Sequence, residues 1–412
     1  MTTLQANLSE KGSGLGLRPR QRKIQFVLFL ASFASSTVAF VAFDYFYSAA
    51  IRRAPASISC GVHDPVREHA LKPNCASIEH WGGDSYQFFT NDLGFRDEKI
   101  RAVPLTDVRP RILMLGGSFT EGQLAWHESY VGRVADRFPQ YDFLNGGVVG
   151  YSPSNDLNVA RMVLAKGVEV DEVIVFMDIA DVQYEAAYFQ DADASGAVTG
   201  PEEGRWIAPD DANWHFRISR NFALTSDVLE SVERFVVGHG YYHLSGNWFG
   251  DVFGMEKSAW TYRKVNERDP YMIGYAPLGV EGGIAKEKAK MTLLWQELAK
   301  RSIPISVVVY PYPAQLLHDT ADSRQVRLWR EWCEGKCKRF ISLFPAFLAA
   351  KDQCPRIQPG CWYVDLFVFG DTHYSAAGNA LVADAVIKSL EEEPPAKHQQ
   401  AVQALGSTGR LQ

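Results

Sequence analysis

Two short segments of the sequence carry side chains suited to nucleophilic chemistry. The first, Leu113–Gly122, ends an apolar run with two glycines and places Ser118 where a helix can begin. The second, Phe369–Gly378, contains Asp371 and His373, two residues apart. A serine hydroxyl is a weak nucleophile that needs a base, usually a histidine oriented by a carboxylate. Each segment alone is also consistent with a helix cap or a surface turn, but together they predict a nucleophile, its base and an orienting acid.

Alternating strand and helix patterns must position these residues. Continuous apolar runs predict strands at 111–115, 141–144, 172–177 and 303–310. Helical patterns fall at 127–138, 154–166, 284–301 and 375–390. Strands buried on both faces and separated by helices form parallel sheets, so the predicted fold class is α/β, a three-layer α/β/α sandwich with a parallel sheet. Ligands bind such sheets at the carboxyl ends of the strands, where Ser118 is expected to lie.

A long uncharged run precedes this region. Ile24–Phe43 contains no charged residue, and about 20 apolar residues cross the hydrocarbon core of a bilayer. Basic residues cluster on its N-terminal side, which predicts an inside N-terminus and an exported remainder. A cleaved signal peptide is the alternative, although its hydrophobic region is normally only about 7–15 residues. We therefore expect a single-pass protein of the inner (cytoplasmic) membrane, with its catalytic domain in the periplasm or otherwise outside the cytoplasm.

The expected organisation has six parts. They are a cytoplasmic tail at 1–23, a transmembrane anchor at 24–50, an extracytoplasmic lead-in at 51–105, a catalytic domain at 106–392, an insertion within it at about 185–280, and a disordered tail at 393–412. The insertion is rich in aromatic residues, which are either a stacking platform for sugar rings or ordinary core and interface residues. These residues are Trp206, Trp214, Tyr241, Tyr242, Trp248 and Trp260.

Cysteine usage agrees with export. All six cysteines follow the apolar run, and an even number in an oxidising compartment suggests disulfides. Proximity favours the pairs Cys60–Cys75, Cys333–Cys337 and Cys354–Cys361, among fifteen connectivities that six cysteines allow. Metal binding by Cys333 and Cys337 is the alternative, but no histidine follows at the spacing of a zinc site, so we expect neither metal nor other cofactor. The net charge of −6 leaves no basic excess for nucleic acid.

Three of these segments resemble the motif blocks of the SGNH (GDSL) hydrolases. Gly116–Gly122 is similar to the first block, usually Gly-Asp-Ser-x-Thr-x-Gly. Asn145–Ser152 resembles the second block, and Asp371–Gly378 the last. The blocks occur in the family's order and cover about 106–390, apart from the insertion.

The resemblance implies a role for each matching residue. Ser118 would be the nucleophile, His373 the base and Asp371 the carboxylate that orients it. The backbone N–H groups of Ser118 and Gly150 would form the oxyanion hole, which stabilises the negative charge of the tetrahedral intermediate.

The third block departs from the family pattern. It usually reads Gly-x-Asn-Asp, and its asparagine donates a hydrogen bond to the oxyanion, whereas Phe176–Asp181 has Ala180 at that place. Losing one such donor costs about 10²–10³ in rate, so a substitute is needed if turnover is fast. Asn155 is the candidate substitute. Asp178 and Asp181 are better explained as structural caps at the end of a strand.

The Asp-x-His spacing of the last block is a second departure, since many of these hydrolases have Asp-x-x-His. The shorter form is similar to the SGNH proteins that assist polysaccharide O-acetylation, which are exported, N-terminally anchored and work beside a membrane-bound O-acyltransferase. The resemblance therefore implies serine-dependent O-acyl transfer, with acetyl as the expected group, to or from an envelope or exported polysaccharide. The substrate would be an acylated carbohydrate, and the partner a membrane-bound O-acyltransferase.

Two alternatives remain open. A secreted carbohydrate esterase or lipase-type hydrolase uses the same acyl-serine intermediate with water as acceptor. The other alternative is that the protein is not an enzyme but a binding or scaffold protein of the envelope. The absence of the third-block asparagine, with Ala180 in its place, favours this alternative.

Overall fold

The computed structural model describes residues 19–50, 60–81, 84–191, 196–200, 221–242, 253–264 and 270–396. The chain divides into two compact units. One comprises residues 1–53 with 210–230, and the other comprises 54–209 with 231–412.

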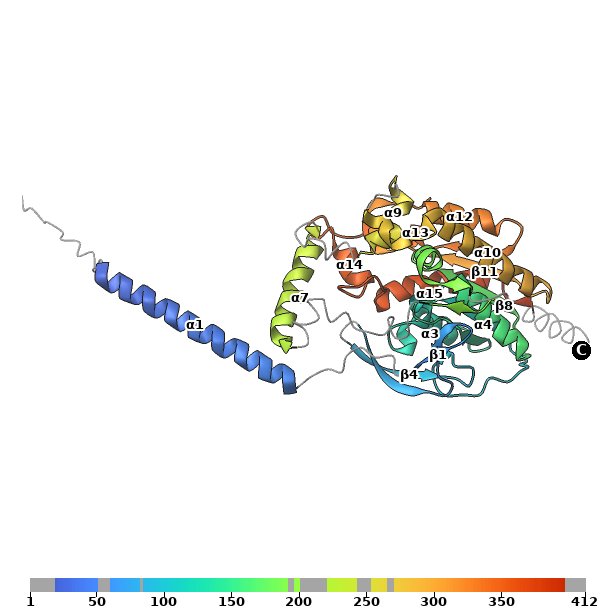
Figure 1. Cartoon of the computed structure of the whole chain (residues 1–412), viewed down its shortest axis with the longest axis horizontal. Helices are drawn as coiled ribbons and strands as arrows, with labels where there is room; N and C mark the ends of the chain where they lie inside the picture. The colour runs from blue at the N-terminus through green and yellow to red at the C-terminus, as the bar shows by residue number, and fades with distance from the viewer. Residues whose placement is uncertain are drawn as a thin grey trace, which may run out of the picture. The chain divides into compact units, whose positions relative to one another are not determined.

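The larger unit is built on an eight-stranded sheet (Figure 1). Five of its strands are parallel, and they are β6 (Arg111–Gly116), β7 (Asp142–Asn145), β8 (Glu172–Met177), β11 (Ile305–Val309) and β12 (Cys337–Ser342). Their spatial order is β12-β11-β8-β6-β7, so the chain order reverses beside β6. Such a switch point opens a crevice at the carboxyl ends of the strands, where α/β proteins bind ligands. The residues that follow β6 lie at this point.

The lead-in is part of the same sheet. Three antiparallel strands extend it beyond β7, namely β5 (Arg96–Asp97), β4 (Asp84–Thr90) and β3 (Ala76–Trp81). The sequence patterns predicted no strand in the lead-in, and they also missed β12. Two separate hairpins pair β1 (Gly61–Asp64) with β2 (Glu68–Leu71) and β9 (Gln190–Asp191) with β10 (Val198–Thr199).

Helices cover both faces of the sheet, so the three-layer α/β/α fold is confirmed. On one face α3 (Tyr130–Arg137) packs against α15 (Ala376–Glu392), and on the other α4 (Pro153–Ala165) packs against α10 (Gly279–Ala299), with α12 (Arg324–Cys333) in the same layer. Strand residues alternate between these layers, as a pleated sheet requires. In β6, Ile112 and Met114 join the core on one face, while Leu113 and Leu115 join the core on the other.

Further helices connect these elements. They are α2 (Ser118–Glu121), η1 (Trp126–Glu128), α5 (Asp181–Gln183), η2 (Tyr184–Tyr188), α7 (Ala223–Gly238), α9 (Met255–Tyr262), η4 (Pro270–Tyr275), α11 (Pro313–His318), α13 (Phe344–Asp352) and α14 (Cys361–Leu366). Of these, α7, α9 and η4 and most of η2 come from the predicted insertion, which therefore contains regular structure.

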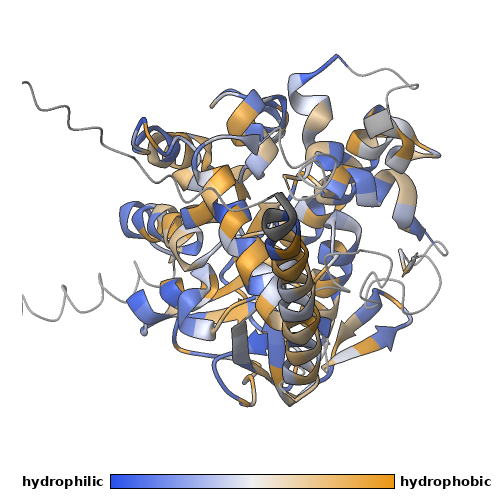
Figure 2. Ribbon diagram, turned by 90° about the vertical axis from the view of Figure 1, so that its left-hand side faces the viewer, coloured by the Kyte–Doolittle hydropathy of each residue, from blue (hydrophilic) through white to orange (hydrophobic). Residues whose placement is uncertain are grey.

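The smaller unit contains one long apolar helix, α1 (Pro19–Ala50). Its segment Lys23–Ala50 has a mean hydropathy of 2.1 and is long and apolar enough to cross a membrane, a property that a signal sequence at this position shares. Figure 2 shows the mostly hydrophobic colouring along it. Within the same unit, the Asp44 carboxylate accepts hydrogen bonds from the backbone N–H groups of Leu224 and Thr225, both at 2.9 Å, at the start of α7. This side chain thus satisfies donors that a helix N-terminus leaves unpaired.

All six cysteines are paired as proximity suggested. The disulfides are Cys60–Cys75, Cys333–Cys337 and Cys354–Cys361. The second joins the end of α12 to the start of β12. Such crosslinks are typical of proteins that fold in an oxidising compartment.

Candidate active site

The turn after β6 places Ser118 at the carboxyl edge of the sheet. Gly116 has a φ of +146°, and a Cβ atom there would lie 2.4 Å from the Thr120 Oγ1 and 2.9 Å from the Phe176 carbonyl oxygen. Only glycine fits that conformation and that space. The chain then enters α2, with Ser118 as its first residue.

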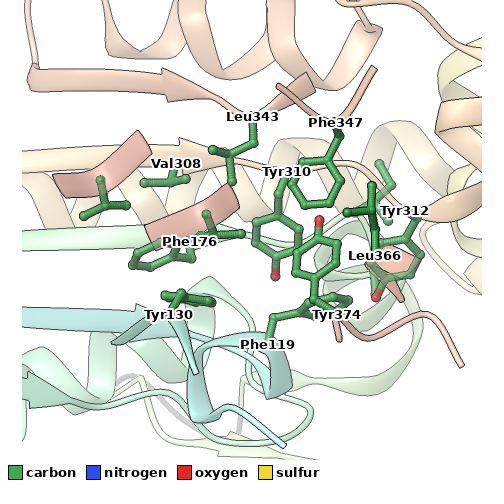
Figure 3. Packing of buried hydrophobic residues seen from close by; sticks show 14 of the residues in the cluster. Phe119, Tyr130, Phe176, Val308, Tyr310, Tyr312, Leu343, Phe347, Leu366 and Tyr374 are labelled. Carbon is green, nitrogen blue, oxygen red and sulfur yellow. The ribbon is translucent and has the colours of Figure 1, made fainter. Parts of the chain in front are cut away.

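The residue after the nucleophile fixes the orientation of this turn. Phe119 is buried, and its ring centre lies 5.0 Å from that of Tyr310 and 4.9 Å from that of Tyr374 (Figure 3). Burying a phenylalanine contributes about 1.5–3 kcal/mol. Phe119 thus anchors the turn in this aromatic core, while Ser118 beside it stays only partly buried.

The structure brings Ser118, His373 and Asp371 into one hydrogen-bonded line, although Ser118 and His373 are 255 positions apart. The Ser118 Oγ lies 2.7 Å from the His373 Nε2. On the other side of the ring, the His373 Nδ1 lies 2.6 Å from the Asp371 Oδ1. With the Nδ1 proton held by the carboxylate, the Nε2 is the nitrogen left to accept the serine proton, as general-base catalysis requires.

The short Asp-x-His spacing has a local explanation. The Asp371 Oδ1 accepts hydrogen bonds from both the backbone N–H of His373, at 3.1 Å, and its ring Nδ1. A spacing of two lets one oxygen hold the backbone and the ring of the same residue. Tyr363 supports this turn, because its hydroxyl donates to the Asp371 carbonyl and accepts from the Gly370 N–H, both at 3.1 Å.

Asp371 is held in its charged form. Burial works against ionisation, but the interaction with His373 and the hydrogen bonds from His373 and Thr372 lower the pKa of Asp371 below its ordinary value. An ionised carboxylate here stabilises the imidazolium that forms when His373 takes a proton.

Trp81, at the end of β3, completes the surroundings of this carboxylate. Its indole Nε1 donates to the Asp371 Oδ2 at 2.8 Å, so both carboxylate oxygens are bound. Its ring also meets the His373 ring edge-on, with centres 5.4 Å apart. Sequence analysis missed this residue, because it lies 290 positions from Asp371 in a segment that carries no motif.

Buried polar contacts tie the first block to the second. The Val149 N–H donates to the Glu121 Oε2 at 2.7 Å, and the Asn145 Nδ2 donates to the Thr120 carbonyl at 2.8 Å. Burial raises the pKa of Glu121 to about 7, even though the Val149 bond and the nearby charge of Arg96 favour its ionised form. These buried hydrogen bonds therefore fix the loop that follows β7 to α2.

This packing brings the second block beside the nucleophile. A Cβ atom on Gly117 would lie 3.2 Å from the Tyr151 carbonyl oxygen, so the backbones of the two blocks are neighbours. Gly150 has a φ of +78°, a conformation that favours glycine. The expected oxyanion residues Ser118 and Gly150 thus come from adjoining turns.

The third block lacks a side-chain donor, as the sequence indicated. The Asp178 Oδ1 accepts from the Ala180 N–H, and the Asp181 Oδ2 accepts from the Asp178 N–H, both at 2.9 Å. Both aspartates therefore cap the turn at the end of β8. Ala180 offers only a methyl group at the place of the family's asparagine.

Asn155, the candidate substitute donor, makes structural contacts at the start of α4. It is buried at the start of α4, where its Oδ1 accepts from the Ser152 N–H at 3.3 Å and its Nδ2 donates to the Arg67 carbonyl at 2.8 Å. The first of these bonds is half of a helix-capping box. Its amide oxygen and its amide nitrogen thus each have a partner in the surrounding backbone.

The structure describes three of the six aromatic residues named for the insertion. Trp206, Trp214 and Trp248 lie outside the described residues. Trp260 is only 2% exposed and packs in the core, which agrees with the second of the two alternatives, an ordinary core residue. Tyr242 is partly buried, its hydroxyl accepting from the Trp362 Nε1 at 3.2 Å, and Tyr241 is exposed.

Within the ranges that the structure describes, no group of three or more His, Cys, Asp or Glu side chains is arranged to hold a metal ion.

Comparison with known proteins gives distant structural likenesses. No family model matches the sequence, and no curated protein matches it. Among solved structures, the SGNH-hydrolase family esterase AlinE4 is 14% identical, covers 71% of this chain and 100% of its own, and gives a TM-score of 0.31. A mutant of Axe2, an acetyl-xylooligosaccharide esterase from Geobacillus Stearmophilus, is 13% identical over 69% and 95% of the two chains, with a TM-score of 0.36.

A third structure is longer than this chain. The match to BT4096, a gut microbial diltiazem-metabolizing enzyme, is 11% identical, covers 68% of this chain and has a TM-score of 0.36. The chain spans about half the length of that protein, 46%. The fold is established by the strand order and the helix layers of the chain itself, and the proposed chemistry rests on the geometry of Ser118, His373 and Asp371.

Proposed function

We propose that this protein transfers a short acyl group, acetyl in the first instance, to or from an exported or envelope polysaccharide through an acyl-Ser118 intermediate. The observation that carries the proposal is the hydrogen-bonded line from Ser118 through His373 to Asp371, with distances of 2.7 and 2.6 Å. Each contact lies within the range of a formed hydrogen bond.

The reaction begins with attack by the Ser118 Oγ on the carbonyl carbon of an acyl ester. His373 takes the serine proton, and the carbonyl oxygen becomes the oxyanion of a tetrahedral intermediate. The backbone N–H groups of Ser118 and Gly150 stabilise that charge. When the intermediate collapses, His373 returns its proton to the departing hydroxyl group, and the acyl group stays on Ser118.

The second half of the reaction decides between transferase and hydrolase. An acceptor hydroxyl gives up its proton to His373 and attacks the acyl carbon, which releases Ser118. A sugar hydroxyl as acceptor gives O-acylation, whereas water gives ester hydrolysis. The helix α1 is long and apolar enough to cross a membrane, which supports a membrane-anchored protein, and a membrane-bound O-acyltransferase is the partner we propose. The Asp-x-His spacing resembles that of O-acetylation proteins, which also supports the hypothesis that the protein is a transferase.

The test compares the two acceptors directly. The full-length protein, in detergent, is supplied with p-nitrophenyl acetate and an unacetylated oligosaccharide, and both free acetate and acetylated sugar are measured. The proposal predicts acetylated sugar in the wild type and none in Ser118→Ala. Free acetate alone would establish an esterase, which is the second candidate function. Neither product would favour a non-catalytic scaffold, for which the absence of a donor at Ala180 is the supporting observation.

A further inference from the structure

The missing donor of the third block leaves one part of the oxyanion site without a side chain. Ala180 has no polar group there, and the Asn155 amide is engaged at the start of α4. A cation can replace a neutral donor in this role, because lysine and arginine also stabilise developing oxyanions. The insertion brings one such cation, Lys257 on α9, to this part of the molecule.

The start of α9 lies against the loop that carries the base. A Cβ atom on Gly254, which precedes α9, would lie 2.4 Å from the Tyr312 ring and 3.2 Å from the Thr372 Cγ2. Thr372 stands between Asp371 and His373 in the sequence. The residue that precedes α9 therefore lies close to the Asp-x-His segment.

The same turn of α9 also reaches the third block. The Gln183 Nε2 donates to the Glu256 Oε1 at 3.3 Å, and the Lys257 Nζ lies 5.7 Å from the centre of the Tyr184 ring. Tyr184 is one helical turn beyond Ala180, and its N–H bonds the Ala180 carbonyl at 3.0 Å. Lys257 therefore lies over the turn in which the family places its asparagine.

The position and charge of Lys257 are both fixed. The Tyr275 hydroxyl donates to the Lys257 carbonyl at 2.7 Å, which holds the backbone of α9 at this residue. The proximity of Tyr184, and then of Asp178 and Asp371, raises the pKa of Lys257 above its ordinary value despite burial. The ammonium group is consequently charged across the neutral range, and it is close enough to both aspartates to feel the charge of each.

We propose that Lys257 is the electrostatic substitute for the missing third-block asparagine and stabilises the oxyanion formed when Ser118 attacks an acyl ester. This inference rests on the proposed acyl chemistry and assigns to the insertion a part of that site. No proton need leave the lysine, because the charge returns to the carbonyl when the intermediate collapses. The insertion then supplies a function that the sheet itself has lost.

The experiment measures esterase kinetics on p-nitrophenyl acetate with full-length Lys257→Met. The expected result is a fall in kcat of about 10²–10³, the usual cost of one oxyanion donor, with little change in KM. Lys264→Met is the matched control, since Lys264 is an exposed lysine just beyond α9, and it is expected to behave as wild type. Thermal unfolding of each variant shows whether a loss of activity is a loss of folding.

A second variant separates an oxyanion role from a structural one. Adding Ala180→Asn to Lys257→Met restores the family's donor, and we expect at least tenfold recovery of kcat. Full activity in Lys257→Met, or a folded double variant without recovery, would overturn the inference. If the Lys257 role fails in either way but the wild type still turns over the ester, the proposed function stands. A wild type that is never acylated on Ser118 would overturn both the Lys257 role and the proposed function.

Discussion

The two sides of the Ser118 crevice are built in different ways. On the side of β6 and β7, nucleophile and oxyanion loop come from two blocks less than 40 residues apart, joined by buried bonds such as Val149 to Glu121. On the side of β8, the family's donor is absent, and a helix from a long insertion, α9, lies over the turn. The first side is specified by motif, and the second by contacts between distant segments.

The largest expected effect falls on the motif-built side. Ser118→Ala or His373→Ala removes the nucleophile or its base, and we expect a loss of acyl transfer of about 10⁴ or more. Steady-state turnover of p-nitrophenyl acetate measures it, with circular dichroism as the check on folding. Undiminished turnover in either variant would place the chemistry elsewhere.

Glu121 gives a test of how the same side is held together. Its folded pKa of about 7 lies above its ordinary value of 4.5, so the folded state binds a proton that the unfolded state has released between these pH values. Stability from this group is therefore present below about pH 4.5 and is lost as pH rises toward 7, a change of about 3 kcal/mol. Urea unfolding at a series of pH values should show a flatter dependence in Glu121→Gln, and an unchanged slope would contradict the burial argument.

Trp81 probes the join between the lead-in and the catalytic loop. Trp81→Phe keeps the ring beside His373 but removes the bond to the Asp371 Oδ2. A hydrogen bond to a charged group contributes about 1.5–3 kcal/mol, and because His373 still holds the other oxygen we expect roughly a tenfold fall in kcat. The lost bond should also shift the acidic limb of the pH–rate profile, since the carboxylate tunes the base; a merely structural role would leave that limb in place.

The sequence predicted the first side well because local pattern determines it. The sequence placed Ser118 at the start of a helix that follows a strand, which the structure confirms, and apolar runs predicted four of the five parallel strands. It failed for β12, a strand with charged residues at 338 and 339, and for β3 to β5, whose place in the sheet depends on pairing with β7. Trp81 and Lys257 were missed for a related reason, since each reaches the site through long-range packing.

The central claim is that Ser118 is an activated nucleophile, and the intact mass of the full-length protein after exposure to p-nitrophenyl acetate tests it most directly. Wild type and Ser118→Ala are run side by side, with samples quenched early to trap the acyl-enzyme. The account predicts one added acetyl group, located on Ser118 by peptide mapping, in the wild type alone. Equal labelling of both proteins, or no label and no turnover in the wild type, would contradict it.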